Sequence, residues 1–178
     1  MKRTPPRVVL IGAPASGKSK IAKMVAAELG CNRIDTDKVI VSEHGPIVDI
    51  FEAHGEPVFR ALERAAVVAA LAQNAVISLG GGAVVDADTQ RDLAEVNCVL
   101  LTVSEEVVAT RITDPKRPLL KDGLAAWIAL VTQREPIYRA LADRTFDTSH
   151  RPLEDIAAEI CEWIRAGYPQ ESGTKEEN

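Results

Sequence analysis

The sequence predicts an α/β fold in which helices cover both faces of a mostly parallel, five-stranded sheet. Short apolar runs alternate along the chain with stretches of helical spacing, and such alternation favours right-handed crossovers between parallel strands. Polar residues follow several of these runs, at the carboxyl ends of strands where ligands of such sheets bind. The predicted strands are Val8 to Ile11, Arg33 to Asp35, Ala75 to Leu79, Cys98 to Thr102 and Thr145 to Phe146.

Length and composition limit the class of protein. The 178 residues, 46% of them hydrophobic, suffice for a single domain over residues 1–178, whose core spans 7–166 and whose polar, acidic tail at 168–178 is predicted to be disordered. A formal net charge of −5 argues against nucleic acid as the principal partner. The apolar runs are too short for a membrane span, and the three separated cysteines suit a reducing compartment. We therefore expect a soluble, cytoplasmic protein without nucleic-acid or membrane partners.

The first strand runs into a loop that glycines frame at both ends. Its sequence, Gly12-Ala13-Pro14-Ala15-Ser16-Gly17-Lys18-Ser19, matches the phosphate loop of proteins that bind nucleoside triphosphates. Backbone amides and the N-terminus of the next helix can then face phosphate, Lys18 can reach the outer phosphates, and the Ser19 hydroxyl can ligate Mg²⁺. The following helix is predicted over Lys18 to Leu29 and ends at Gly30. A simple glycine turn is the alternative.

Two carboxylates, Asp35 and Asp37, lie at the end of the second predicted strand. Because they are two residues apart, both side chains can project to the same face of a strand. Beside a phosphate loop, one carboxylate can hold Mg²⁺ through water while the other accepts a hydrogen bond from the attacking hydroxyl. Capping of the next helix by Thr36 or Asp37 is the alternative.

Two longer connections interrupt the regular pattern. One covers residues 38–55 and contains Gly45-Pro46, after which Ile47, Ile50 and Phe51 follow at helical spacing. The other covers residues 113–123 and is rich in proline and charge. It is a candidate mobile lid, since transfer of an activated phosphoryl group requires the exclusion of water. An ordinary surface loop is the alternative.

Several arginines and a run of glycines could bind an anionic substrate. Pro57 fits the first turn of a helix, which places Arg60 near an anion-attracting end, although a solvated ion pair of Arg60 with Glu63 is favoured when the two are taken alone. Three consecutive glycines are costly in entropy and predict that a ligand touches the backbone. Each arginine near a loop is by itself more typical of a solvent-facing side chain. These residues are Gly80, Gly81 and Gly82, and Arg111, Arg117, Arg134 and Arg151.

Together these motifs resemble the shikimate kinase family over about residues 7–166. The resemblance rests on the phosphate loop, Asp35-Thr36-Asp37, the segment from Gly55 to Glu63, the triple glycine with Ala83, Arg117-Pro118-Leu119-Leu120, and Arg134 before Tyr138. It implies a three-layer P-loop kinase fold with a mobile lid, ATP and Mg²⁺ as cofactors, and a monomer. The implied reaction transfers the γ-phosphoryl group of ATP to the 3-hydroxyl of shikimate, on the route to chorismate and the aromatic amino acids.

The resemblance also implies a role for each site residue on the nucleotide side. Lys18 and Arg117 would stabilise the transferring phosphoryl group, with Arg117 folding over from the lid at 113–123. Ser19 and Asp35 would hold Mg²⁺. The nucleotide would contact Ala15, Ser16, Gly17, Lys18, Ser19 and Lys20, with Arg111, Arg151 and Pro152 around adenine.

On the acceptor side, the resemblance implies that segment 38–63 binds shikimate. Asp37 would orient or deprotonate the attacking hydroxyl. Arg60 and Arg134 would bind the ring carboxylate, with Glu63 steadying Arg60, and the backbone of Gly80, Gly81 and Gly82 would contact the ring.

One departure and two other functions stay open at this point. Ala15 stands where the family usually has glycine, so a positive φ at this residue would alter the loop. A gluconate or nucleoside monophosphate kinase could share the same fold. A non-catalytic sensor that binds nucleotide is the other alternative.

Overall fold

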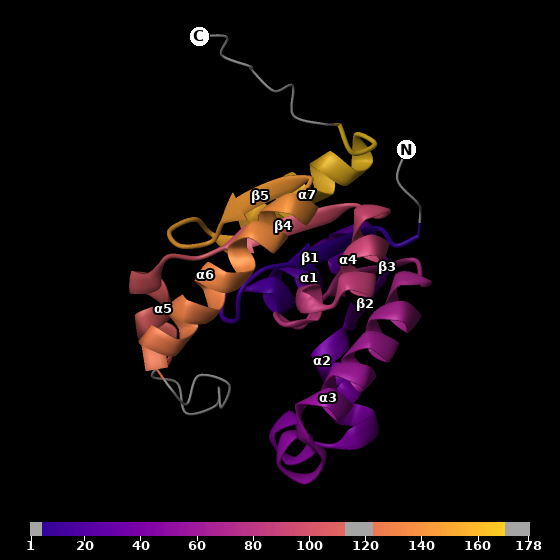
Figure 1. The fold of residues 1–178 in the computed structure, drawn as a ribbon. Coiled ribbons are helices and arrows are strands. Elements are labelled where there is room, and N and C mark those ends of the chain that lie inside the picture. The colour runs from indigo at the N-terminus through magenta and orange to yellow at the C-terminus, as the bar shows by residue number, and fades with distance from the viewer. Residues whose placement is uncertain (1–4, 113–122, 170–178) are drawn as a thin grey trace, which may run out of the picture.

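The computed structural model describes residues 5–112 and 123–169 and contains one five-stranded sheet (Figure 1). The strands lie in the order β2-β3-β1-β4-β5, and every pairing is parallel. The predicted strand number and positions are confirmed, with bounds that differ by at most one residue at either end. The strands are β1 (Val8–Ile11), β2 (Asn32–Asp35), β3 (Ala75–Ser78), β4 (Cys98–Thr102) and β5 (Arg144–Asp147).

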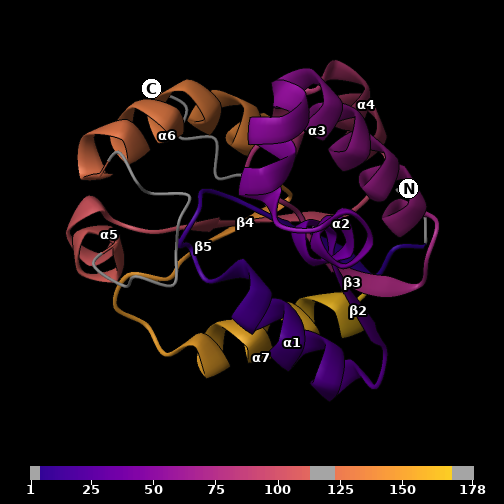
Figure 2. The same cartoon turned by 90° about the horizontal axis from the view of Figure 1, so that it is seen from below.

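Helices cover both faces of this sheet, so the predicted three-layer arrangement is confirmed (Figure 2). One face carries α1 (Lys18–Leu29) and α7 (Leu153–Arg165). The other carries α3 (Ile47–Leu71), α4 (Ala87–Ala94) and α6 (Gly123–Leu141), together with the short 3-10 helix η1 (Ala83–Val85). The remaining helices are α2 (Thr36–His44) and α5 (Glu105–Ile112).

The central strand β1 is buried on both faces, which explains its continuous apolar sequence. Val8 and Leu10 pack with α1 and α7, whereas Val9 and Ile11 pack with the helices of the opposite face. All four side chains are almost completely removed from water. This burial anchors the carboxyl end of β1, from which the phosphate loop starts.

The segment at 38–55, predicted as a connection, is mostly helical. It holds most of α2 and the first half of α3, and only Gly45 and Pro46 separate the two helices. Gly55 interrupts α3 with a φ of 78° and a ψ of 172°, a conformation that suits glycine. Pro57 then occupies the first turn of the second half. The two helices form a lobe beside the carboxyl ends of the strands (Figure 1).

The prediction of a disordered tail from residue 168 is wrong for Tyr168. Its ring packs edge-on against Trp163, with centroids 5.1 Å apart, and its hydroxyl donates a hydrogen bond of 2.8 Å to the carbonyl of Arg7. Residues 170–178 lie outside the described residues, as does the candidate lid at 113–123 except for Gly123, which begins α6. In the part of the chain that is described, no helix is long and apolar enough to cross a membrane.

Candidate functional site

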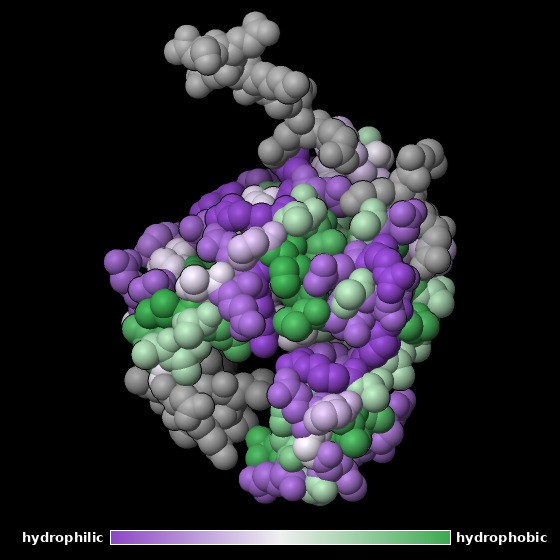
Figure 3. Space-filling view, in the orientation of Figure 1, coloured by the Kyte–Doolittle hydropathy of each residue, from purple (hydrophilic) through white to green (hydrophobic). Residues whose placement is uncertain are grey.

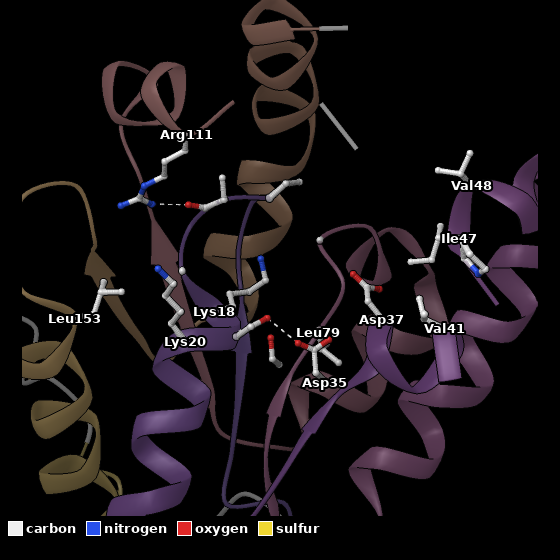
Figure 4. Close-up of a pocket in the computed structure, with 17 residues that line it drawn as sticks. Lys18, Lys20, Asp35, Asp37, Val41, Ile47, Val48, Leu79, Arg111 and Leu153 are labelled. Carbon is white, nitrogen blue, oxygen red and sulfur yellow. Dashed lines mark hydrogen bonds between the residues drawn. The ribbon is translucent and has the colours of Figure 1, made fainter. Parts of the chain in front are cut away.

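A cavity of about 600 Å³ lies at the carboxyl ends of the central strands. The phosphate loop lines one side, and Asp35 and Asp37 line the other (Figure 4). The space-filling view shows a hollow between the lobe of α2 and α3 and the rest of the molecule (Figure 3). This size is typical of a site for small molecules.

The phosphate loop is held by side chains that bind its carbonyl oxygens. Five successive carbonyls, those of residues 12–16, each accept a hydrogen bond from a side chain. These bonds fix the orientation of the peptides, so the loop is preorganised for an anion before one binds. The donors are Lys18 Nζ to Gly12 (2.8 Å) and Ala13 (2.7 Å), Trp127 Nε1 to Pro14 (2.9 Å), Arg111 Nη1 to Ala15 (2.5 Å) and Thr148 Oγ1 to Ser16 (2.9 Å).

Lys18 is the buried cation of this loop, with 9% of its surface exposed. Burial lowers the pKa of its ammonium group to about 8, while the carboxylates of Asp37 and Asp35 oppose the shift. The side chain therefore still carries its charge at neutral pH, although less firmly than an exposed lysine. Such a cation can bind the phosphates of a nucleotide.

Ala15 adopts a positive φ of 67°, the left-handed conformation that favours glycine. The methyl group therefore strains the phosphate loop. The strained peptide is held by the bond between Arg111 and the Ala15 carbonyl (Figure 4). Strain of this kind at a binding loop persists only where the surroundings determine the conformation.

We expect the substitution Ala15→Gly to stabilise the protein by about 0.5–1 kcal/mol, because relief of about 1–2 kcal/mol of left-handed strain exceeds the entropic cost of glycine. Thermal unfolding of the ligand-free protein should show a rise in Tm of about 1–4 °C. Ala13→Gly is the control, since Ala13 is buried in the same loop without a positive φ, and this variant should lose stability. An unchanged or lower Tm for Ala15→Gly would contradict the account of strain.

Ser19 and Asp35 form a hydroxyl–carboxylate pair at the floor of the cavity. Ser19 Oγ donates a hydrogen bond of 2.6 Å to Asp35 Oδ2 (Figure 4). The other carboxylate oxygen of Asp35 accepts a hydrogen bond from the backbone of Lys38 and caps α2. The cap is therefore Asp35, and the alternative interpretation, capping by Thr36 or Asp37, is wrong. Thr36 instead accepts a hydrogen bond of 3.0 Å from the amide of Gly80.

Asp37 lies in the first turn of α2, two residues beyond the end of β2, and therefore not on the strand face that the spacing suggested. Its carboxylate still reaches the cavity that Asp35 lines. Burial raises the pKa of Asp37, and the charge of Asp35 adds to this effect, while Lys18 and Arg60 oppose it. Asp37 is therefore a stronger base than an exposed aspartate.

The three consecutive glycines leave room for side chains of the site. A Cβ atom on Gly80 would lie 2.3 Å from Asp37 Oδ1, and one on Gly82 would lie 2.4 Å from Arg60 Nη1. A Cβ atom on Gly81 would lie 3.2 Å from Pro14 Cδ. None of the three has a positive φ. Space for neighbouring side chains is thus one reason for the glycines. Gly81 also lines the cavity, and contact of a ligand with this backbone stays a prediction.

The ion pair between Arg60 and Glu63 is partly buried, so the alternative of a solvated surface pair is wrong. Arg60 Nη1 and Glu63 Oε2 are 2.6 Å apart, and only 5% of the Glu63 side chain is exposed. Burial raises the pKa of the Glu63 carboxyl, and the Arg60 guanidinium opposes this shift. Arg60 also binds Glu56 and lies 5.4 Å from the centroid of the Phe59 ring. These contacts hold its guanidinium against Gly82.

Arg134 on α6 contributes a second cation to this side of the site. Its Nε atom is buried and has no hydrogen-bond partner among residues 5–112 and 123–169. Its charge acts on Glu63 and on Lys18, whose pKa values it lowers. A buried donor without a partner is costly, so this position favours an anionic ligand.

The remaining predicted residues divide into those inside and outside the cavity. Gly17, Lys20 and Arg111 line it, whereas Arg151 is exposed and pairs with Glu159. Five residues on the acceptor side lie next to the lining and not in it: Arg60, Glu63, Gly80, Gly82 and Arg134. Pro152 precedes α7 outside the lining, Ser16 is fully buried within the phosphate loop, and Arg117 lies outside the described residues. Segment 38–63, which was expected to bind the acceptor, supplies part of the lining, although none of these residues was named singly; they are Val41, Pro46, Ile47 and Val48. Ser78, Leu79 and Leu153 also line the cavity and were not predicted as site residues.

Comparisons with known proteins agree on one family. The shikimate kinase family model matches residues 14–165. A shikimate kinase of Streptomyces avermitilis is 41% identical over 163 residues, which cover 89% of this chain and 95% of that protein. One from Thermobifida fusca is 41% identical over 165 residues, or 90% of this chain and 96% of that protein.

Solved structures give the same result for the fold. Shikimate kinase from Acinetobacter baumannii in complex with shikimate matches with a TM-score of 0.84 and 30% identity, over 92% of this chain and 95% of that chain. A gluconokinase from Sinorhizobium meliloti matches with a TM-score of 0.60 and 19% identity, over 94% and 95%. The latter likeness concerns the fold alone.

Proposed function

Since the chain belongs to the shikimate kinase family, we propose that it transfers the γ-phosphoryl group of ATP to the 3-hydroxyl of shikimate. One observation carries the proposal beyond family membership: the phosphate loop and the Asp37 carboxylate line the same cavity. A nucleotide on the loop would therefore present its outer phosphate to an acceptor held near Asp37. The product is shikimate 3-phosphate.

On the acceptor side, Asp37 accepts the hydrogen bond of the attacking hydroxyl and takes its proton. Its raised pKa favours this role, because a more basic carboxylate binds the proton better. Arg60 and Arg134 bind the carboxylate of shikimate, and Glu63 holds Arg60 in place. The acid end and the reacting hydroxyl are thus fixed separately, which orients the acceptor.

On the nucleotide side, the loop and Lys18 bind the phosphates of ATP and stabilise the charge that develops during transfer. Ser19 and Asp35 suit Mg²⁺, since a hydroxyl and a carboxylate lie 2.6 Å apart beside the loop. Mg²⁺, when bound, neutralises charge on the phosphates. Lys20 and Arg111 line the nucleotide side, and we propose that Arg117 closes over it from segment 113–123. We further propose one domain that acts as a cytoplasmic monomer.

The direct test is ADP formation by the purified protein with ATP and Mg²⁺. Shikimate is the acceptor, and quinate, gluconate, a nucleoside monophosphate and no acceptor are run in parallel. Turnover that depends on shikimate is expected. Turnover with gluconate or a nucleotide instead would establish the alternative kinase, and nucleotide binding without any turnover would favour the sensor.

The lowered pKa of Lys18 predicts that kcat/KM for ATP falls at alkaline pH. Below about pH 8 the free enzyme carries the ammonium that binds phosphate, and above it this charge is lost. We expect kcat/KM for ATP to fall about tenfold per pH unit above the pKa of the free enzyme. At saturating ATP the bound phosphates retain the proton, so kcat/KM for shikimate should lack this limb. A flat profile for ATP up to pH 9.5 would contradict the assignment.

A further inference from the structure

One face of α6 contacts both the phosphate loop and the glycine loop at residues 80–82. Trp127, Arg134 and Tyr138 are seven and four residues apart along this helix, and these spacings place them on one face. Trp127 Nε1 donates a hydrogen bond of 2.9 Å to the carbonyl of Pro14 in the phosphate loop. The Tyr138 hydroxyl donates one of 2.6 Å to the carbonyl of Gly81 in the glycine loop at 80–82. Both side chains are buried, with 3% and 2% of their surface exposed.

The two loops also touch each other at the residues that α6 holds. A Cβ atom on Gly81 would lie 3.2 Å from Pro14 Cδ and 3.4 Å from the carbonyl oxygen of Gly12. The glycine loop therefore packs directly on the phosphate loop. Gly80 and Gly82 in turn lie against Asp37 and Arg60, two groups of the acceptor side. A shift of either loop would change the distance between nucleotide and acceptor.

We propose that Trp127 and Tyr138 are positioning residues, which fasten the phosphate loop and the glycine loop to α6 and so set the two substrates relative to each other. Each of these hydrogen bonds is partly buried, so when the side-chain donor is removed, water replaces it poorly and the carbonyl loses its hydrogen bond. Trp127 acts on the nucleotide loop and Tyr138 acts on the loop beside the acceptor. Neither side chain needs to contact a substrate.

The inference rests on the proposed function, because its main readout is turnover of ATP and shikimate. Trp127→Phe removes the indole donor and keeps an aromatic ring. We expect it to raise the KM for ATP and the Kd for ADP about five- to tenfold, which corresponds to one lost hydrogen bond, and to change the KM for shikimate less than twofold. Tyr138→Phe should raise the KM and Kd for shikimate by a similar factor and change the KM for ATP less than twofold. Both should lower kcat, because misplaced substrates react more slowly.

The chain supplies a matched control for each variant. It contains two tryptophans and two tyrosines, and the second residue of each type also donates a hydrogen bond to a backbone carbonyl. Trp163 Nε1 binds the carbonyl of Pro169 at 3.0 Å, and the Tyr168 hydroxyl binds that of Arg7 at 2.8 Å, both away from the cavity. Trp163→Phe and Tyr168→Phe lose the same kind of bond. They should lower Tm while leaving both KM values unchanged.

The outcome is read from kinetics and from calorimetric titration with ADP and with shikimate. The proposal is overturned if Trp127→Phe leaves the Kd for ADP within twofold of the unsubstituted protein, or if the controls shift binding as much. Should Trp127→Phe not fold, Tyr138→Phe decides, and a Kd for shikimate within twofold of that of the unsubstituted protein would overturn the proposal. Absence of shikimate turnover in the unsubstituted protein would defeat the proposed function alone, because ADP binding still tests Trp127.

Discussion

Replacement of Asp37 by asparagine is expected to lower kcat about 10²- to 10⁴-fold, the range that a general base contributes. The amide keeps the size of the side chain against Gly80 but cannot accept the hydroxyl proton. The KM values should change much less, because the phosphate loop and both arginines remain. Steady-state kinetics with shikimate measures the loss. Asp49→Asn, at an exposed carboxylate on the same lobe, is the control and should keep full activity.

The same substitution should stabilise the folded protein. The pKa of Asp37 is raised in the fold, so its ionised form is disfavoured there relative to the unfolded chain. At pH values above the ordinary pKa of 3.8 the ionised carboxylate therefore costs stability, and a neutral isostere removes that cost. We expect a higher Tm at pH 7, with the difference shrinking as the pH falls. Retention of kcat within tenfold, or a lower Tm, would contradict the role given to Asp37.

The sheet and the phosphate loop could be predicted because their signals are local. The apolar run of β1 follows from burial on both faces, and the loop from Gly12 to Ser19 has a spacing that phosphate binding requires. Gly30 ends α1 in the left-handed conformation, as expected for a glycine stop signal. Family motifs then extended the prediction to residues far apart in the chain.

Details that depend on tertiary packing could not be predicted in this way. A spacing of three residues between Arg60 and Glu63 looks the same for a surface pair and for a buried one, and only the packing of α3 decides between them. Asp35, Thr36 and Asp37 are all residue types that cap helices, so the capping residue was ambiguous. Nothing local to Ala15 indicates its positive φ, and Arg111, which donates to its carbonyl, is 96 residues away in the sequence.

Removal of the Arg60 side chain is expected to weaken shikimate binding strongly. Arg60→Ala should raise the KM for shikimate about 10- to 100-fold, since hydrogen bonds between charged groups are worth about 1.5–3 kcal/mol, and should leave the KM for ATP within twofold. Arg64→Ala is the matched control. Arg64 lies on the same helix but donates to Thr89 and, at 2.6 Å, to Asp92 on α4, whereas Arg60 lies against Gly82, so loss of Arg64 should not change either KM.

A second substitution separates the binding role of Arg60 from its structural role. Arg60→Ala leaves the Glu63 carboxylate buried without its guanidinium partner, so it should also cost about 1–3 kcal/mol of stability. Adding Glu63→Gln removes the unpaired charge, and the double variant should regain much of the lost Tm. If Arg60 binds the substrate carboxylate, the shikimate KM of the double variant stays high despite the recovered stability. Recovery of both together would mean that Arg60 acts only by holding α3, and Arg134, whose buried Nε lacks a protein partner in the described ranges, would then be the principal ligand of the carboxylate.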